Sequence, residues 1–397
     1  MEQRTWQARF LSDGEKRACR ELWEEIFTED SGRFLDYYDR WKYTANECYG
    51  IYDGDRLVSM VQLNPYNMQV GGYGPIAVNY IIAVATRKEY RHRGMMAALL
   101  KESLGQMRKK RMPFVFLMPA AEAIYHPFGF RYFYESSVGT LKLCTAQEGN
   151  QGSGQTLSVR LAGFADMKRL VDFSEAVQAE LFDCYTKRDR CYYERLLEEL
   201  KSENGGLLLL MRAGQIIASV PFWGDGPVEI REILCRPQDK EQVLFTLGRW
   251  ARAGLAGKNP ERLSVTGASF DLDEKKPTIM GRIVDAKSFL ELFSAEEPVE
   301  LFLELSDGFL GENDGLYRWN LSQDGSRAER ISPLESQFLK AADLSGGGSR
   351  TAEGEIDPEI IRCTAAELFF CLMGGDKPEG VFRKVRVCQK AYINEIV

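Results

Sequence analysis

A short basic segment, YRHRG at residues 90–94, lies between an apolar run and a stretch with helical spacing. The apolar run, residues 78–86, predicts a buried strand, and residues 95–111 predict a helix with a basic C-terminal end. The N-terminus of a helix presents unpaired backbone N–H groups, and glycine lets a ligand approach the backbone closely. Arginine can bind phosphate through two parallel hydrogen bonds. The two arginines and the glycine therefore predict a pyrophosphate site, the alternative being a solvated basic turn.

The segments around this turn indicate an α/β unit over residues 1–150. Residues 14–30 have helical spacing, and residues 48–63 predict a hairpin whose Asp-Gly turn tolerates positive φ. Residues 114–120 predict a further strand, which a short helical piece and a last strand follow. This order of elements is typical of a mixed sheet flanked by helices, so the fold class that we expect is α/β (α+β).

A second unit, residues 151–283, repeats the first weakly after a Gly/Ser/Gln-rich stretch at 148–156 that predicts a linker. Residues 205–224 predict a hairpin, and residues 228–255 predict a strand, a turn and a helix. The turn, RPQDKEQ, has no glycine and carries two acidic residues that would repel phosphate. We interpret this unit as a copy that has lost the anion site.

A third unit, residues 284–397, contains an apolar helical segment at 365–375 and a flexible SGGGSR stretch at 345–350. It ends in the apolar tail YINEIV. An apolar C-terminus is unusual, because chain termini usually fray into water. The tail therefore predicts either a final strand or a segment that inserts into another part of the protein.

The composition of the chain argues against several classes of protein and kinds of site. A net charge of −7 over 397 residues disfavours a general nucleic-acid binder. The chain has no run of 18 apolar residues and no N-terminal signal-peptide core, so we expect no membrane span and a cytoplasmic protein. Nine scattered cysteines without a CxxC motif favour reduced thiols. Only two histidines are present, which argues against a His-rich zinc site, and we expect no metal.

The basic turn resembles a known nucleotide-cofactor motif. VATRKEYRHRGMMAALL is similar to the acetyl-CoA motif of the GNAT acetyltransferase superfamily, [R/Q]-x-x-G-x-[G/A], in which Arg91 and Gly94 match. Met96 departs from the usual small residue. Further along, EAIYHPFGFRYF resembles the next segment of the superfamily, Y-x-x-x-G-[F/Y], which Tyr125 and Gly129 match. The two motifs occur in the expected order.

With a second unit that lacks the anion site and a further terminal unit, the whole chain resembles the enhanced intracellular survival (Eis)-like family of GNAT N-acetyltransferases. The resemblance implies a catalytic GNAT domain at 1–150 and a second GNAT-like domain without the cofactor motif at 151–283. It implies a sterol-carrier-protein-like α+β domain at 284–397. It also implies a homo-oligomer, a hexamer in the family, with the catalytic site in the first domain.

The same resemblance implies roles for individual residues. Tyr125 would be the general acid that protonates the departing CoA thiolate, and the C-terminal carboxylate of Val397 would be the base. The stretch FTED resembles a part of the acceptor pocket, in which Glu29 and Phe27 would contact the substrate. Acetyl-CoA would be bound as co-substrate by two backbone segments. They consist of Val84, Ala85 and Thr86 at the pantetheine arm, and of Arg91, His92, Arg93, Gly94, Met95 and Met96 at the pyrophosphate.

This chemistry is physically reasonable. An amine of pKa about 10.4 is mostly protonated at pH 7, and reaching the neutral form costs about 4–5 kcal/mol. A carboxylate can take the proton directly or through water. A free α-carboxyl is a weak base unless it is desolvated, which an inserted apolar tail would achieve. A tyrosine of pKa about 10 suits a leaving thiolate of pKa about 8.5.

Alternatives remain for the site and for the whole protein. Tyr125 could be only a packed aromatic, His126 could be the base, and Glu29 could belong to a solvated charge run. The chain could be a non-catalytic CoA- or lipid-binding carrier, although a carrier would have no use for the tyrosine motif. An acyltransferase for longer chains is a third possibility. The acceptor suggested by the resemblance is a primary amine, either an aminoglycoside-like polyamine or a lysine side chain.

Overall fold

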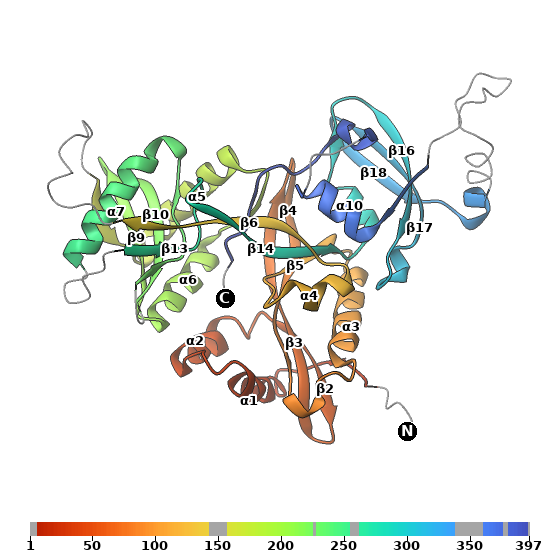
Figure 1. Cartoon of the computed structure of the whole chain (residues 1–397), viewed down its shortest axis with the longest axis horizontal. Coiled ribbons are helices and arrows are strands. Elements are labelled where there is room, and N and C mark those ends of the chain that lie inside the picture. Colours follow the sequence, from red (N-terminus) through yellow and green to blue (C-terminus); the bar gives the residue numbers. More distant parts are fainter. Residues whose placement is uncertain are drawn as a thin grey trace. The chain divides into compact units, whose positions relative to one another are not determined.

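The computed structural model describes residues 6–142, 157–224, 228–254, 262–337, 360–375 and 380–395. The chain divides into two compact units (Figure 1). The first consists of residues 1–26, 46–134 and 279–391, and the second of 27–45, 135–278 and 392–397. The boundary between them falls inside two long strands, β6 (Arg131–Lys142) and β14 (Glu274–Ile283). The division into three domains at 150 and 283 stays a prediction.

A twisted mixed sheet forms the framework of the first unit. Its strands run in the order β1-β2-β3-β4-β5-β14. β5 is parallel to β4 and antiparallel to β14, whose residues Met280–Ile283 pair with it. The predicted strands at 78–86 and 114–120 are confirmed, as is the hairpin at 48–63. The strands are β1 (Arg9–Phe10), β2 (Glu47–Asp53), β3 (Arg56–Val70), β4 (Tyr73–Thr86) and β5 (Phe114–Leu117).

The predicted helix at 14–30 is too long. Helix α1 (Lys16–Ile26) ends at Ile26, and a separate helix, α2 (Gly32–Trp41), begins six residues later. The Ser31 side chain accepts a hydrogen bond from the Phe34 N–H at 3.0 Å and so caps α2. Serine, threonine and aspartate favour caps and turns because their side chains compete for backbone hydrogen bonds. The stretch TEDS therefore breaks the helix.

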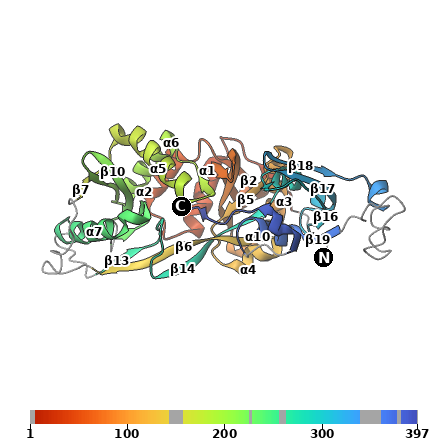
Figure 2. The same ribbon diagram turned by 90° about the horizontal axis from the view of Figure 1, so that it is seen from above.

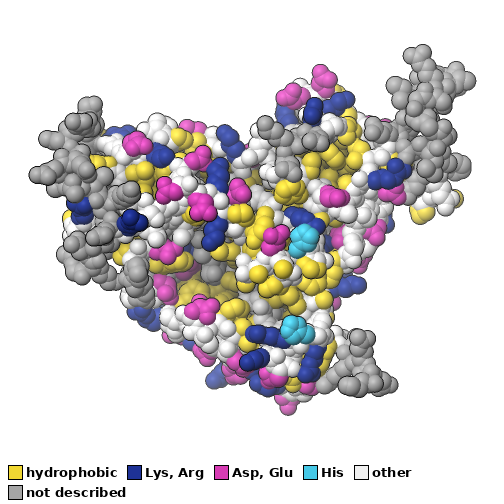
Figure 3. Space-filling view, in the orientation of Figure 1, with side chains coloured by type: hydrophobic (Ala, Val, Ile, Leu, Met, Phe, Trp, Pro, Cys, Tyr) yellow, Lys and Arg dark blue, Asp and Glu magenta, His cyan; other side chains and the backbone are white. Residues whose placement is uncertain are grey.

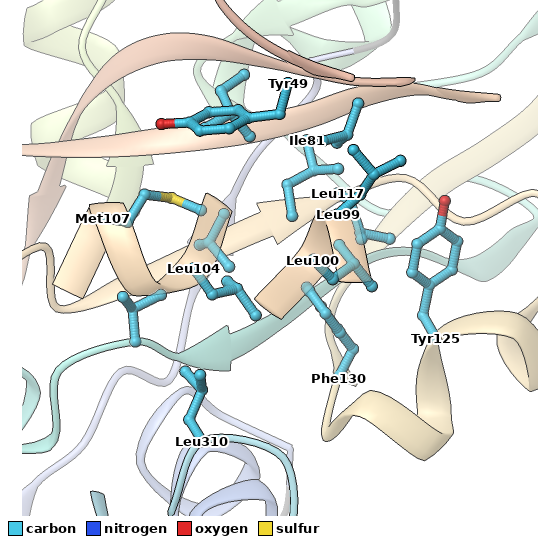
Figure 4. Packing of buried hydrophobic residues seen from close by; sticks show 14 of the residues in the cluster. Tyr49, Ile81, Leu99, Leu100, Leu104, Met107, Leu117, Tyr125, Phe130 and Leu310 are labelled. Atoms are coloured by element: carbon cyan, nitrogen blue, oxygen red, sulfur yellow. The ribbon is translucent and has the colours of Figure 1, made fainter. Parts of the chain in front are cut away.

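Helix α3 (Met95–Lys109) packs on the sheet of the first unit and closes its core. Its buried side chains recur at helical spacing, and Figure 4 shows Leu99, Leu100, Leu104 and Met107 among the packed cluster. Each buried leucine stabilises the fold by about 1.5–3 kcal/mol relative to an exposed one. The core thus holds α3, and with it the turn before α3, against β2, β3 and β4.

The C-terminal strands and helices of the first unit share its core. Strands β18-β17-β16-β19 form a separate sheet, in which β19 is parallel to β16. Phe369 of α10 lies 6.0 Å from Phe114 of β5 and 5.6 Å from Phe289 of α8 between ring centroids. The predicted helix at 365–375 is confirmed. The elements are α8 (Ala286–Leu290), β15 (Ser294–Ala295), β16 (Val299–Ser306), β17 (Gly315–Ser322), β18 (Gly325–Arg330), β19 (Ile360–Thr364), α10 (Ala365–Leu372) and β20 (Val385–Arg386).

The strands of the second unit run in the order β6-β13-β11-β10-β9-β7, with helices on both of their faces (Figure 2). Leu208 and Leu210 of β9 share a buried cluster with α7, whereas α5 and α6 lie on the other face. The predicted hairpin at 205–224 and the strand, turn and helix at 228–255 are confirmed. The elements are β7 (Ser158–Leu161), α5 (Met167–Leu181), β8 (Cys184–Thr186), α6 (Arg190–Ser202), β9 (Gly206–Arg212), β10 (Gln215–Trp223), β11 (Glu229–Ile230), β12 (Leu234–Cys235), α7 (Lys240–Gly254) and β13 (Arg262–Val265).

The linker at 148–156 and the SGGGSR stretch at 345–350 lie outside the described residues. The tail is described as far as residue 395, and its last strand is β21 (Ala391–Tyr392). Among the described helices, none is long and apolar enough to cross a membrane.

Candidate active site

Strand β4 carries a bulge at the level of Ala83. Ile82 pairs with Gln62 of β3 and Ala85 pairs with Met60, so two residues of β4 face a single residue of β3. Ala83 adopts φ +50°, which is uncommon for a residue with a side chain. Bulges of this kind re-aim the backbone and are frequent beside active sites. The sequence gives no indication of this bulge, because a positive φ is not expected at an alanine.

Beyond the bulge, β4 extends past the end of its parallel neighbour. The β4–β5 ladder runs from Asn79 and Val115 to Ile81 and Leu117, where β5 ends. β4 continues to Thr86, and in this stretch it pairs with β3 alone among the described strands. The segment predicted to bind pantetheine, Val84 to Thr86, therefore lies on a strand edge that β5 leaves uncovered. An extended ligand can add to such an edge by backbone hydrogen bonds.

The turn after β4 has the backbone that an anion site needs. A short 3-10 helix, η1 (Lys88–Tyr90), precedes it, and Gly94 caps α3 with φ +76°. The first helical hydrogen bond runs from the Ala98 N–H to the Gly94 carbonyl at 3.1 Å. The N–H groups of Met95 and Met96 thus precede this bond at the positive end of the helix dipole. A Cβ on Gly94 would meet no atom within 4 Å, so glycine is required here by φ and not by space.

The basic side chains of the turn are exposed and tied to its backbone. Arg91 Nε donates to the Thr86 carbonyl at 3.2 Å, and Arg93 Nη2 donates to the Glu89 carbonyl at 2.7 Å. The Arg93 guanidinium also lies 5.2 Å from the centroid of the Tyr90 ring. His92 has φ +61°. Both histidines of the chain lie exposed on the face shown in Figure 3, with basic side chains nearby.

Tyr125 ends α4 (Glu122–Tyr125), the short helix after β5, and is only 8% exposed. Burial raises its pKa to about 12. Its ring meets the Phe130 ring edge to face at 5.8 Å, and its side chain extends from α4 beside Leu99 and Leu117, with the hydroxyl at the end far from α4 (Figure 4). No described residue hydrogen-bonds that hydroxyl. Tyr125 is thus both a packed aromatic and a protonated phenol, which is the form a general acid needs.

A tight turn links the tyrosine to the core. The 3-10 helix η2 (His126–Phe128) ends at Gly129, which has φ +82°, and Phe130 then enters the core fully buried. A positive φ favours glycine, so the spacing Y-x-x-x-G-F has a structural reason. His126, the alternative base, is exposed on this turn.

The other predicted site residues belong to the second unit or lie outside the described residues. Phe27 and Glu29 belong to the second unit, in the turn between α1 and α2, where Phe27 is half-buried and Glu29 is exposed. Val397 lies outside the described residues. The first unit therefore contains Val84–Thr86, Arg91–Met96 and Tyr125, and the side chains of Val84, Met95, Met96 and Tyr125 pack in one hydrophobic cluster. Within the described residues, no group of three or more His, Cys, Asp or Glu side chains is placed to hold a metal ion.

Comparisons with known proteins find an acetyltransferase domain and chains of similar fold. Residues 7–133 match the acetyltransferase (GNAT) domain. An uncharacterized N-acetyltransferase of Streptomyces avermitilis is 23% identical over 347 residues, which cover 75% of this chain and 78% of that protein. A probable N-acyltransferase of Enterococcus faecalis has a similar fold, with a TM-score of 0.75, 16% identity and 98% of each chain covered. Eis1 from Mycobacterium abscessus is similar with a TM-score of 0.64 and 12% identity, covering 98% of this chain and 100% of that one.

These matches define the chain as an acyltransferase with a GNAT acetyltransferase domain. The predicted enzyme class is confirmed. The prediction of a mixed α/β fold is also confirmed, and the similarity to Eis1 extends to the fold of the whole chain. The reading as a non-catalytic carrier is not favoured.

Proposed function

We propose that this enzyme transfers the acetyl group of acetyl-CoA to a primary amine, either of a polyamine or aminoglycoside-like compound or of a lysine side chain. One observation carries the proposal. An uncovered strand edge, a glycine-capped helix N-terminus and a buried protonated tyrosine occur within one compact unit.

Two backbone segments would bind the co-substrate. Val84, Ala85 and Thr86 would pair with the amide groups of pantetheine, since β5 leaves this edge of β4 uncovered. The N–H groups across Arg91–Met96 would bind the pyrophosphate, and the arginine side chains would add charge. His92 and Met95 contribute through their backbone in this arrangement. The side chain of Met96 replaces the small residue usual at its position and would be accommodated by its flexibility.

The transfer would proceed by direct attack. The neutral amine nitrogen forms a bond to the thioester carbonyl carbon, and the carbon–sulfur bond breaks to leave the CoA thiolate. Tyr125 gives its proton to that sulfur and regains one from solvent, while the proton released by the amine goes to a base. The products are the N-acetylated amine and CoA. Because the pKa of Tyr125 is raised to about 12, its hydroxyl carries the proton throughout the physiological range.

Further features are proposed on the resemblance to the Eis-like family. The C-terminal carboxylate of Val397 would be the base, and Glu29 and Phe27 would contact the acceptor. The terminal domain would be sterol-carrier-protein-like, and the enzyme would form a homohexamer in the cytoplasm. The likeness of the whole fold to Eis1 supports these proposals but does not test them.

The test is a thiol-release assay with acetyl-CoA and a panel of polyamines, aminoglycosides and lysine peptides. Removal of the acid should lower kcat about 10²–10⁴-fold in Tyr125→Phe. Tyr132→Phe is the matched control, because Tyr132 lies seven residues along the same segment and packs on the same core cluster. Full turnover by Tyr125→Phe would refute the acid role, and acetyl-CoA binding without amine-dependent release would refute the reaction.

A further inference from the structure

A buried ion pair lies beside the turn that carries Tyr125. Arg282, near the end of β14, donates from Nη2 to Oδ1 and Oδ2 of Asp307 at 3.0 and 2.7 Å. Their side chains are only 2% and 4% exposed. Asp307 directly follows β16 in the C-terminal part of the first unit.

Hydrogen bonds hold the Asp307 carboxylate of this pair in place. Its Oδ1 accepts from the N–H groups of Phe309 and Leu310 at 3.1 and 2.9 Å, and its Oδ2 accepts from Asn313 Nδ2 at 3.0 Å. A carboxylate held by three donors besides the guanidinium has little freedom to move. The Arg282 guanidinium is consequently held at one place and in one plane.

The fixed guanidinium of Arg282 also holds the turn that follows Tyr125, residues 126–129. Its Nη1 donates to the carbonyl of Phe128, the last residue of η2. Its guanidinium also lies 5.9 Å from the centroid of the Phe130 ring, which meets the Tyr125 ring at 5.8 Å. On the neighbouring side, the Phe309 ring meets the Phe128 ring edge to face at 5.0 Å. The turn is thus held by contacts to the Phe128 carbonyl and to the rings of Phe128 and Phe130.

The turn needs such support. α4 and η2 contain four and three residues, and helices this short have little stability of their own. A cavity of about 220 Å³ borders the turn, lined by His126, Pro127, Gly129 and Arg131 together with Asp307. The turn therefore has room to shift on that side if the contact from Arg282 is lost.

Stability alone is a weak reason for this ion pair. Burying two charges costs as much as their attraction returns, and apolar replacements of buried pairs are often as stable. The pair is better explained by the single orientation that it imposes on the groups bonded to it.

We propose that Arg282 and Asp307 are positioning residues for Tyr125, so that the C-terminal part of the chain sets the geometry of proton donation to the leaving thiolate. This inference rests on the proposed role of Tyr125 as general acid. It assigns a function to two residues that lie more than 150 positions after the tyrosine in the sequence.

The first variants to measure are Arg282→Lys, which keeps the charge, and Arg282→Met combined with Asp307→Asn. The double variant removes both charges and keeps an amide oxygen for the N–H groups of Phe309 and Leu310. Loss of a supporting group of this kind lowers activity about 10- to 100-fold. We expect kcat to fall by this factor while the KM for acetyl-CoA changes less than about threefold, because the cofactor turn is untouched. Thermal denaturation identifies the variants that are folded.

Two controls separate positioning from general damage. Arg160→Lys disrupts another bidentate arginine–carboxylate pair, with Asp166 at 2.7 and 2.5 Å in the second unit, and should leave kcat unchanged. The second control places Arg282→Lys in the Tyr125→Phe background. If Arg282 acts through the tyrosine hydroxyl, it should have little further effect there.

The outcomes are distinct. A wild-type kcat in a folded Arg282 variant would overturn the proposal. So would the same fold-loss with and without the tyrosine hydroxyl, because the arginine would then act independently of it. Full activity of Tyr125→Phe by itself would instead refute the proposed function on which this inference rests.

Discussion

Replacement of Gly94 by alanine tests whether the backbone of the basic turn binds the cofactor. Gly94 has φ +76° and ψ 8°, and a Cβ there would meet no atom within 4 Å. The whole cost of Gly94→Ala is therefore backbone strain, which is about 1–2 kcal/mol for a residue in the left-handed region. Steric repulsion from neighbours adds nothing.

That strain should appear in two measurements. Urea denaturation should show a decrease of about 1–2 kcal/mol in the free energy of unfolding if the turn keeps its conformation. If the turn instead relaxes in the free enzyme, binding must restore it, and the same energy weakens acetyl-CoA binding about 5- to 30-fold. Isothermal titration with acetyl-CoA distinguishes the two cases. The sum of both losses should stay near the strain energy.

Gly105 provides the matched control. It lies inside α3, and a Cβ there would also meet nothing within 4 Å. Gly105→Ala should stabilise the enzyme by about 0.5–1 kcal/mol, because alanine is the better helix former, and should leave acetyl-CoA binding unchanged. A Gly94→Ala enzyme with both wild-type stability and wild-type binding would show that the left-handed turn has no energetic importance.

Two further predictions concern stability. Gly267→Ala would place a Cβ 2.6 Å from Asn394 Oδ1 and 2.8 Å from the Arg231 carbonyl oxygen. This overpacking should lower the free energy of unfolding by about 1–3 kcal/mol. Gly163→Ala is the control, because a Cβ there has open space around it and should leave the free energy of unfolding nearly unchanged. Equal stability of the two variants in urea would contradict this packing. Burial of the neutral Tyr125 phenol raises its pKa to about 12 from about 10 in the unfolded chain, so its contribution to stability is complete below about pH 10 and is lost as the pH rises through about 12. The wild-type enzyme should therefore lose more unfolding free energy between about pH 10 and 12 than Tyr125→Phe, and parallel losses would contradict it.

The sequence predicted the elements that depend on local patterns. The apolar run at residues 78–86 indicated a buried strand, and the helical spacing of α3 follows from burial of one face. Gly94 marked the basic turn correctly, because a positive φ is a local requirement that glycine satisfies most readily. The helix predicted over residues 14–30 was wrong at its end, since the apolar spacing alone concealed the capping signal at Ser31.

Features that depend on contacts between distant segments could not be predicted from the sequence. The bulge at Ala83 arises from the register between β3 and β4, and an alanine carries no mark of it. The antiparallel pairing of β14 with β5 joins residues more than 160 positions apart. Neither strand specifies its neighbour, because a buried apolar strand can pair with many others and the choice depends on how the whole core packs.

The sequence by itself determined the class of this protein, an acyltransferase, because the motifs around Gly94 and Tyr125 are recognisable from residue type and spacing. Glycine conformation, helix termini and arginine chemistry act within a few residues, so a linear motif contains them. Only the tertiary structure decided that Arg282 and Asp307 lie against the tyrosine turn. An ion pair is fixed by distance in space, and a single sequence does not specify which arginine and which aspartate the folded core will bring within 3 Å.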